Sequence, residues 1–207
     1  MELIAGAVNY IYEASEDDTY RYALGKEATG KKPLLWLCVN PSTAKLVQSA
    51  NPPYIEYDRT VTRIENISKL HGYDSWVMLN IYSQRATEPV KLVTDGNEVG
   101  KAHEKNIETI KAIITDNSTV VAAWGGGAIA ERAYLGRYLQ SIATKIQQRK
   151  IQWCCLGDLT KEGHPRHPSR VAANTGLADF DFADYIKTVR KWERKYTEKN
   201  YALTLIL

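Results

Sequence analysis

The stretch Leu34-Leu35-Trp36-Leu37-Cys38-Val39 runs directly into Asn40-Pro41-Ser42-Thr43, so an apolar run ends in a polar turn. A short, continuous apolar run bounded by turn residues is typical of a strand that is covered on both faces of a parallel sheet. Three more runs of this kind follow, at residues 75–81, 119–124 and 151–156. Together the four runs predict a central four-stranded parallel sheet.

Helical patterns fill the segments between these runs. In each pattern apolar residues recur every three or four positions, as on the buried face of an amphipathic helix. The helical patterns cover residues 57–71, 98–115, 128–149 and 179–199. Gly72 follows the first of them, and glycine commonly ends helices. Alternating strands and helices predict an α/β fold, here a three-layer sandwich formed by a single domain over residues 1–207.

The remaining segments are predicted to be connections. Residues 10–33 have the pattern of a hairpin or an irregular lead-in, and residues 87–100 are predicted to form a loop.

Composition and charge narrow the possible classes of protein. The net charge is only +3, which allows a nucleic-acid partner without demanding one. Cys38, Cys154 and Cys155 lie in apolar runs and lack the spacing of a metal site. The sequence shows neither the pattern of a signal peptide nor an apolar run of membrane-spanning length. We therefore expect a monomeric cytoplasmic protein with buried, reduced thiols, no metal, no organic cofactor and no membrane contact.

Polar or glycine-rich sequence follows each predicted strand. Ligands of open parallel sheets bind outside the carboxyl ends of the strands, so these segments should meet at one edge. They are Asn40-Pro41-Ser42, Asn80, Trp124-Gly125-Gly126-Gly127, and a loop that contains His167-Pro168-Ser169-Arg170. We expect Asn40, Asn80 and His167 to share one cleft at that edge.

These residue types match the needs of a nucleobase ligand. The amides of Asn40 and Asn80 offer both donors and acceptors to a base edge. A neutral His167 can donate to an oxygen that gains negative charge. Ser42 and Ser169 can hold a phosphate, as turn residues often do.

Each motif also has a purely structural interpretation. Asn-Pro-Ser-Thr is a common helix-capping signal, here ahead of residues 44–48. The three glycines from Gly125 can simply allow close strand–helix packing, since they lack the Gly-Lys-Ser/Thr of a P-loop. A basic helix face is usually just solvated.

In their order and context, the motifs resemble those of the uracil-DNA glycosylase superfamily. Asn40-Pro41-Ser42 resembles its first motif, Asn80 its base-reading strand end, Trp124-Gly125 the strand before its last motif, and His167-Pro168-Ser169 that last motif. The chain departs from the pattern at Cys38, where Gly is usual, and after Ser169, where Arg170-Val171-Ala172-Ala173 replaces the usual wedge. Asn40 stands where the fastest branch has an aspartate.

At closer range the chain resembles a domain-of-unknown-function family of short bacterial and phage proteins. The shared segments are Asn40-Pro41-Ser42-Thr43-Ala44, Asp58-Arg59-Thr60, Arg85-Ala86-Thr87-Glu88-Pro89, Trp124-Gly125, Leu156-Gly157 and Pro165-Arg166-His167-Pro168.

The superfamily resemblance implies a DNA N-glycosidase that flips out and excises a uracil-like or modified pyrimidine. Asn40 would orient water and His167 would donate to the leaving base, while Asn80 would read the base edge. Pro41, Trp124 and Gly125 would shape the substrate site, and Ser42, Ser169 and Arg170 would grip DNA phosphates. Lys161, Arg166 and the basic face of the last helix would add phosphate contacts. The alternatives are a non-catalytic module that binds nucleic acid or a modified nucleotide, and a different enzyme of nucleotide metabolism.

Overall fold

A seven-stranded sheet forms the centre of the computed structural model, with strand order β1-β2-β6-β3-β7-β8-β9. The structure describes residues 8–28, 31–47, 49–50, 53–86, 97–126, 129 and 132–191. The four predicted runs form the parallel middle of the sheet, as β6 (Trp76–Asn80), β3 (Leu34–Cys38), β7 (Thr119–Ala122) and β8 (Gln152–Leu156). The predicted α/β class and the parallel pairing of these runs are therefore confirmed.

Antiparallel strands extend this parallel core on both sides. The sheet therefore has seven strands, not the four that were predicted. β1 (Val8–Ala14) and β2 (Arg21–Ala28) form the expected lead-in hairpin, and β2 pairs with β6. On the other side β9 (Leu177–Asp179) pairs with β8. The added strands protect edges that would otherwise expose unpaired backbone groups.

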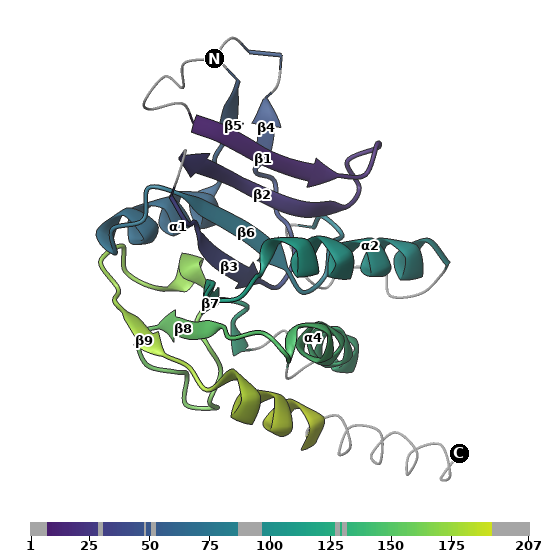
Figure 1. Cartoon of the computed structure of the whole chain (residues 1–207), viewed down its shortest axis with the longest axis vertical. Coiled ribbons are helices and arrows are strands. Elements are labelled where there is room, and N and C mark those ends of the chain that lie inside the picture. Colours follow the sequence, from purple (N-terminus) through teal and green to yellow (C-terminus); the bar gives the residue numbers. More distant parts are fainter. Residues whose placement is uncertain are drawn as a thin grey trace.

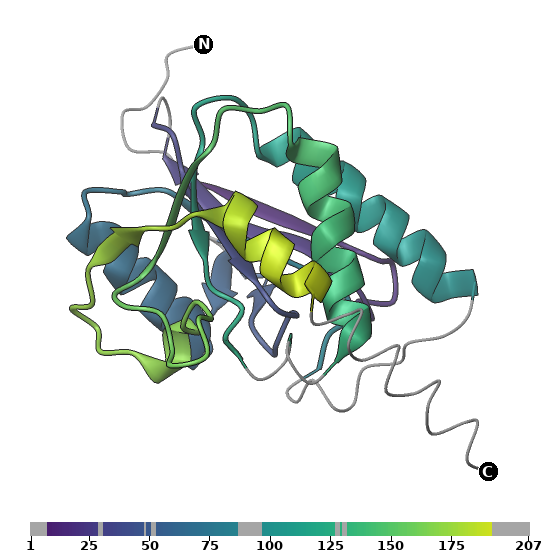
Figure 2. The ribbon, with the colours of Figure 1, turned by 90° about the horizontal axis from the view of Figure 1, so that it is seen from below.

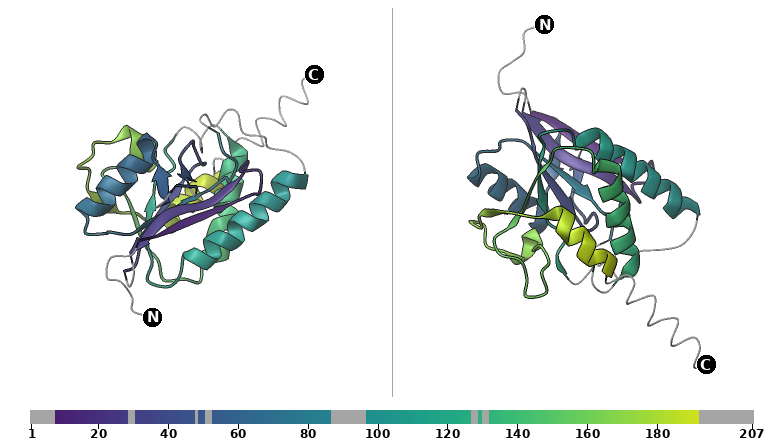
Figure 3. Two further views of the ribbon diagram at one scale, coloured as in Figure 1. Left: turned by 90° about the horizontal axis from the view of Figure 1, so that it is seen from above. Right: turned by 60° about the horizontal axis from the view of Figure 1, so that its bottom comes forward.

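Helices cover both faces of the sheet (Figures 1 and 2). One face carries α1 (Arg59–Leu70) together with the short 3₁₀ helix η2 (Pro168–Arg170). The other face carries α2 (Asn97–Ile113), α4 (Ala133–Ile146) and a last helix described over 182–191. The two further views in Figure 3 show the same division of the helices. The three-layer arrangement thus follows from amphipathic helices that bury their apolar faces on a sheet.

Two separate apolar clusters match these two faces. On the α1 side Trp36 and Met78 pack against Ile64, and the Trp36 Nε1 donates to Ser68 Oγ at 3.1 Å. On the opposite side the side chains of the alternate strand positions pack with α2, α4 and the last helix. Alternation along each strand therefore decides which side chains approach which helices.

Helix boundaries follow local capping. Asp58 caps α1 by accepting from the Val61 N–H at 2.9 Å, and Gly72 follows its end with φ +80°. The last helix begins later than predicted because residues 177–179 join the sheet as β9, and Asp181 then caps it by accepting from the Asp184 N–H at 2.9 Å.

The structural alternative for Asn40-Pro41-Ser42-Thr43, the start of a helix, is not what the described residues after it form, because β4 (Lys45–Val47) pairs with β5 (Tyr54–Glu56). One other predicted boundary was wrong. The predicted loop over 87–100 is too long at its end, because α2 begins at Asn97, with Val99 buried in its first turn. The rest of that loop, the start of the predicted helix at 128, Gly127 and the chain after 191 lie outside the described residues. None of the described helices is both long and apolar enough to cross a membrane.

Candidate functional site

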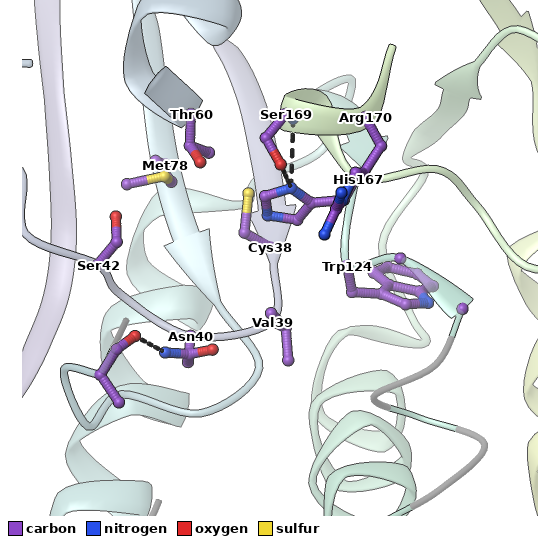
Figure 4. Close-up of a pocket in the computed structure, with 13 residues that line it drawn as sticks. Cys38, Val39, Asn40, Ser42, Thr60, Met78, Trp124, His167, Ser169 and Arg170 are labelled. Carbon is purple, nitrogen blue, oxygen red and sulfur yellow. Dashed lines mark hydrogen bonds between the residues drawn. The ribbon is translucent and has the colours of Figure 1, made fainter. Parts of the chain in front are cut away.

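A cavity of about 440 Å³ opens at the carboxyl ends of the parallel strands, on the side covered by α1 and η2 (Figure 4). Its walls come from the segments after β3, β6 and β7, from α1, and from the loop that contains η2. The lining residues are Cys38, Val39, Asn40, Ser42, Thr60, Met78, Ala86, Trp124, Gly125, Gly126, His167, Ser169 and Arg170. Parallel strands bring these distant segments together because all their carboxyl ends reach one edge.

Asn40 is held by its amide nitrogen. Its Nδ2 donates to the carbonyl of Ala86 at 2.7 Å and to that of Pro41 at 3.0 Å. Pro41 is buried, and its carbonyl also accepts from the Ala86 N–H at 2.9 Å. Two carbonyl partners fix which end of the amide is nitrogen. The Asn40 Oδ1 has no hydrogen-bond partner within the described residues, so it is left as an acceptor on the cavity wall.

His167 is a neutral hydrogen-bond donor. Its Nδ1 accepts from the Ser169 N–H at 3.3 Å and lies 2.8 Å from Ser169 Oγ. Because a backbone N–H can only donate, the ring proton must sit on Nε2. Burial lowers the pKa of His167 to about 4, against an opposing contribution from Asp58 and with a smaller lowering contribution from Arg170. At neutral pH the ring is therefore uncharged, and Figure 4 shows it facing the same space as Cys38 and Ser42.

The glycines after β7 allow the His167 loop to approach. Gly125 has φ +77°, and a Cβ there would lie 3.3 Å from the His167 Cβ. A Cβ on Gly126 would lie 2.9 Å from His164 Cδ2. Gly125 and Gly126 therefore do allow close packing, as predicted. Their neighbour is the loop that carries His164 and His167, and not a helix.

Trp124 has mainly a packing role. It is 1% exposed, and its Nε1 donates to the Tyr185 hydroxyl at 3.1 Å. The same hydroxyl lies 2.9 Å from Nδ1 of His164, in the loop that carries His167. Trp124 therefore links the end of β7, the last helix and the histidine loop, in addition to forming part of the cavity wall.

Asp58, in the segment Asp58-Arg59-Thr60, is connected to the cavity through Ser42. Ser42 Oγ donates to its carboxylate, and the Ala44 N–H donates to the same oxygen at 3.4 Å. The Asp58 carboxylate therefore orients Ser42 on the cavity wall while it caps α1. An acidic residue three positions before the first apolar residue of a helix is a capping signal that the sequence did contain.

Asn80 lies next to the cavity but does not line it. It is fully buried, and it pairs in register with Cys38, a lining residue. Neither its Oδ1 nor its Nδ2 has a hydrogen-bond partner among the described residues. The structure thus places Asn40 and His167 in one cavity, with Asn80 behind it at the same edge.

The comparisons with known proteins identify the family. The model of a family described as "Protein of unknown function (DUF1643)" matches residues 21–169, most of the chain. The chain belongs to this family. The comparisons with curated proteins and with solved structures found no match. The DUF1643 region contains every cavity residue named above except Arg170.

Among the described residues, basic side chains lie on more than one side of this DUF1643 protein. Arg170 is exposed and lines the cavity, whereas the Arg166 Nε donates to the Asp158 carbonyl of its own loop at 2.8 Å. Lys187 and Arg190 are exposed on the last helix, which packs on the other side of the sheet. Among the described residues, no three His, Cys, Asp or Glu side chains gather in a way that could hold a metal ion.

Changing Gly125 to alanine should displace the His167 loop. The new Cβ would press on the His167 Cβ, and the positive φ adds strain, so ligand binding or turnover should drop on the order of tenfold. Gly72→Ala is the matched control, because Gly72 has φ +80° with nothing within 4 Å of its Cβ position. Both variants should lose similar stability in thermal melts. An equal functional loss in both would remove the Gly125–His167 contact from the argument.

Acid should destabilise the DUF1643 protein through its half-buried histidines His103 and His167. Burial lowers the pKa of His103 and of His167 to about 4, against 6.5 for an ordinary histidine. Between these values the unfolded chain binds more protons than the folded chain. The free energy of unfolding should therefore fall as the pH drops from 6.5 towards 4, in urea titrations across this window. His103→Phe should flatten the dependence, and an unchanged slope would contradict the assignment.

Proposed function

We propose that this DUF1643 protein is a metal-free N-glycosidase that releases a pyrimidine base from DNA. One observation carries the proposal: the neutral imidazole of His167 and the Oδ1 of Asn40 line the same cavity of about 440 Å³. A cavity of this size can enclose a base that has been turned out of the stack. The resemblance of the surrounding motifs to uracil-DNA glycosylases supports the same activity.

The chemistry needs one donor and one positioned water. As the glycosidic C–N bond breaks, its electron pair moves onto the base, and the His167 Nε2–H donates to the base oxygen that gains the charge. A water held by the Asn40 Oδ1 attacks the sugar C1′, forms the new C–O bond and loses its proton to solvent. Because His167 is neutral and keeps its proton, it stabilises the anion without being consumed.

Three other lining residues, Ser42, Ser169 and Arg170, are suited to contacts with the DNA backbone. Arg170, exposed at the cavity, and the hydroxyls of Ser42 and Ser169 suit phosphate oxygens on either side of the flipped nucleotide. We further propose that the protein works on DNA as a cytoplasmic monomer. An elution volume of a dimer in size-exclusion chromatography would contradict the monomer.

Base release is the direct test. DNA with ordinary bases and DNA with modified pyrimidines, including phage-modified DNA, are incubated with the protein, and the small molecules are analysed by mass spectrometry. We expect a free pyrimidine and a matching number of abasic sites from at least one substrate. Asn40→Ala should release little. The proposal would be refuted if none of these DNAs released a base when the protein is in excess over the target bases.

A second candidate is a binding module on the same fold. One observation favours it: the described residues that line the cavity include no aspartate or glutamate, so none of them is a strong base for water activation. In that case the wild type binds a base or nucleotide but releases nothing, and His167 substitutions weaken binding. Turnover of free nucleotides in the same assay would instead indicate a different enzyme of nucleotide metabolism.

A further inference from the structure

A bulge in β2 turns Arg21 towards the α1 side of the sheet. In the β1–β2 register Glu13 faces Ala23, but Ala14 faces Arg21, so Tyr22 is the extra residue. A β-bulge reverses the alternation of side chains beyond it. The Arg21 Nη1 accordingly donates to the carbonyl of Ala44, a residue of the apolar cluster on the α1 side.

Arg21 is a buried cation without an ion-pair partner. It is fully buried, and burial together with the nearby charge of Arg85 lowers its pKa to about 10, so it stays protonated at neutral pH. No aspartate or glutamate in the described part of the chain forms a salt bridge with it. The carboxylate of Asp58 is taken by Ser42 and the start of α1, and Asp18 pairs with Arg85 at 3.1 Å. The charge of Asp58 raises the pKa of Arg21 without a direct ion pair, so the two buried N–H groups of Arg21 that lack a partner are the feature to explain.

The two free donors of Arg21 have a specific geometry. Nε and Nη2 have no hydrogen-bond partner among the described residues, and these two N–H groups point in parallel from one edge of the guanidinium. That edge forms a two-pronged fork that fits the two oxygens of a carboxylate. The buried Asn80 is also unpartnered at both amide atoms, and its register partner is Cys38.

The cavity adjoins these groups. Cys38 and Met78, on the same side of the sheet as Arg21, line it, and the Arg21 partner Ala44 lies two residues from Ser42, which also lines it. Neither Arg21 nor Asn80 is among the lining residues, so a ligand group that contacts them has to pass Ser42 and Cys38. A single carboxylate would balance one cation, whereas a doubly charged phosphate ester would leave excess negative charge in a site with apolar walls.

We propose that Arg21 and Asn80 select a base that carries a carboxylate, with the Arg21 fork binding both carboxylate oxygens and Asn80 reading the neighbouring ring edge. This inference rests on the proposed base-binding function of the cavity. A carboxylate at C5 of a pyrimidine could bind both residues at once. C5 is next to C4, whose edge a side-chain amide can read.

The test compares two nearly isosteric ligands. Oligonucleotides contain one pyrimidine with either a 5-carboxyl or a neutral 5-carbamoyl group, on a 2′-fluoro sugar whose glycosidic bond resists cleavage. Dissociation constants are measured by fluorescence anisotropy for the wild type, Arg21→Gln, Arg21→Lys and Asn80→Leu. Lys150→Gln is the charge-matched control, because Lys150 is exposed just before β8, at the opposite end of that strand from the cavity.

The wild type and Lys150→Gln should bind the carboxyl ligand on the order of tenfold or more tighter than the carbamoyl ligand. Arg21→Gln should abolish this ratio, Arg21→Lys should keep part of it, and Asn80→Leu should weaken both ligands. Equal affinity of the wild type for the two ligands would overturn the inference even if Arg21→Gln does not fold, and so would an unchanged ratio in a folded Arg21→Gln.

The two proposals fail separately. Base release from cleavable substrates without a preference for the carboxylate would overturn the Arg21 fork and leave the glycosidase intact. A carboxylate preference in binding with no release from the matching cleavable oligonucleotide would support the fork and overturn the glycosidase.

Discussion

Replacing His167 with alanine should slow base release on the order of a hundredfold or more, because it removes the imidazole donor from the cavity wall. The effect should appear in the single-turnover rate with excess protein, since the donor acts on charge that develops only as the bond breaks. Substrate affinity should change much less. Rates at neutral pH are the relevant ones, because the low pKa of His167 keeps the ring neutral there.

Two further variants make the His167 result specific. Ser169→Ala removes the Oγ contact to Nδ1 but keeps the backbone N–H that fixes the tautomer, so the loss should be smaller. His103→Phe changes a histidine that contacts Tyr138 in the other layer, and it should leave the rate unchanged. A His167→Ala rate within a few-fold of the wild type would show that His167 does not stabilise the leaving base.

Asn40→Ala should also reduce the rate on the order of a hundredfold, with little change in the dissociation constant of the substrate. The variant removes the Oδ1 that would hold the attacking water. It also removes the two bonds from Nδ2 to Pro41 and Ala86, so the melting temperature should be measured on the same sample. The combination of a lower rate and an unchanged dissociation constant is the signature of a water-positioning residue.

Asn66→Ala is the matched control, because it also removes a side-chain amide. Asn66 is exposed on α1, and its loss should leave the rate unaltered. If Asn40→Ala weakens substrate binding as much as it lowers the rate, Asn40 shapes the cavity and does not position water. If the variant keeps full activity, the cavity is not the reactive site.

The sequence predicted the central sheet well because its signal is local. Continuous apolar runs such as Leu34–Cys38 can only be buried on both faces, and such strands pair in parallel under helices. The antiparallel strand β9 was missed because it has only three residues and two of them are half-buried, which gives no periodic pattern. Asn40-Pro41-Ser42-Thr43 was compatible with a helix start, but the pairing of Leu46 with Ile55 across a hairpin decided against it.

The site was predicted from one rule, that the carboxyl ends of the strands in a parallel sheet meet at one edge. As this rule predicted, Asn40 and His167 line one cavity. The rule could not separate a lining residue from a buried one. Asn80 and Cys38 are register partners at adjacent strand ends, yet Cys38 lines the cavity and Asn80 does not, because exposure depends on what packs over each side chain.

The sequence by itself determined the α/β class, the four parallel strands and the edge that carries the polar residues, because periodicity and turn residues are encoded over a few neighbours. Only the tertiary structure decided the neutral tautomer of His167, the orientation of the Asn40 amide and the burial of Arg21. The hydrogen bond to Ala86 joins residues 46 positions apart, and Arg21 reaches Ala44 only because of the bulge in β2. Contacts between distant segments depend on packing and register, which no local stretch of sequence specifies.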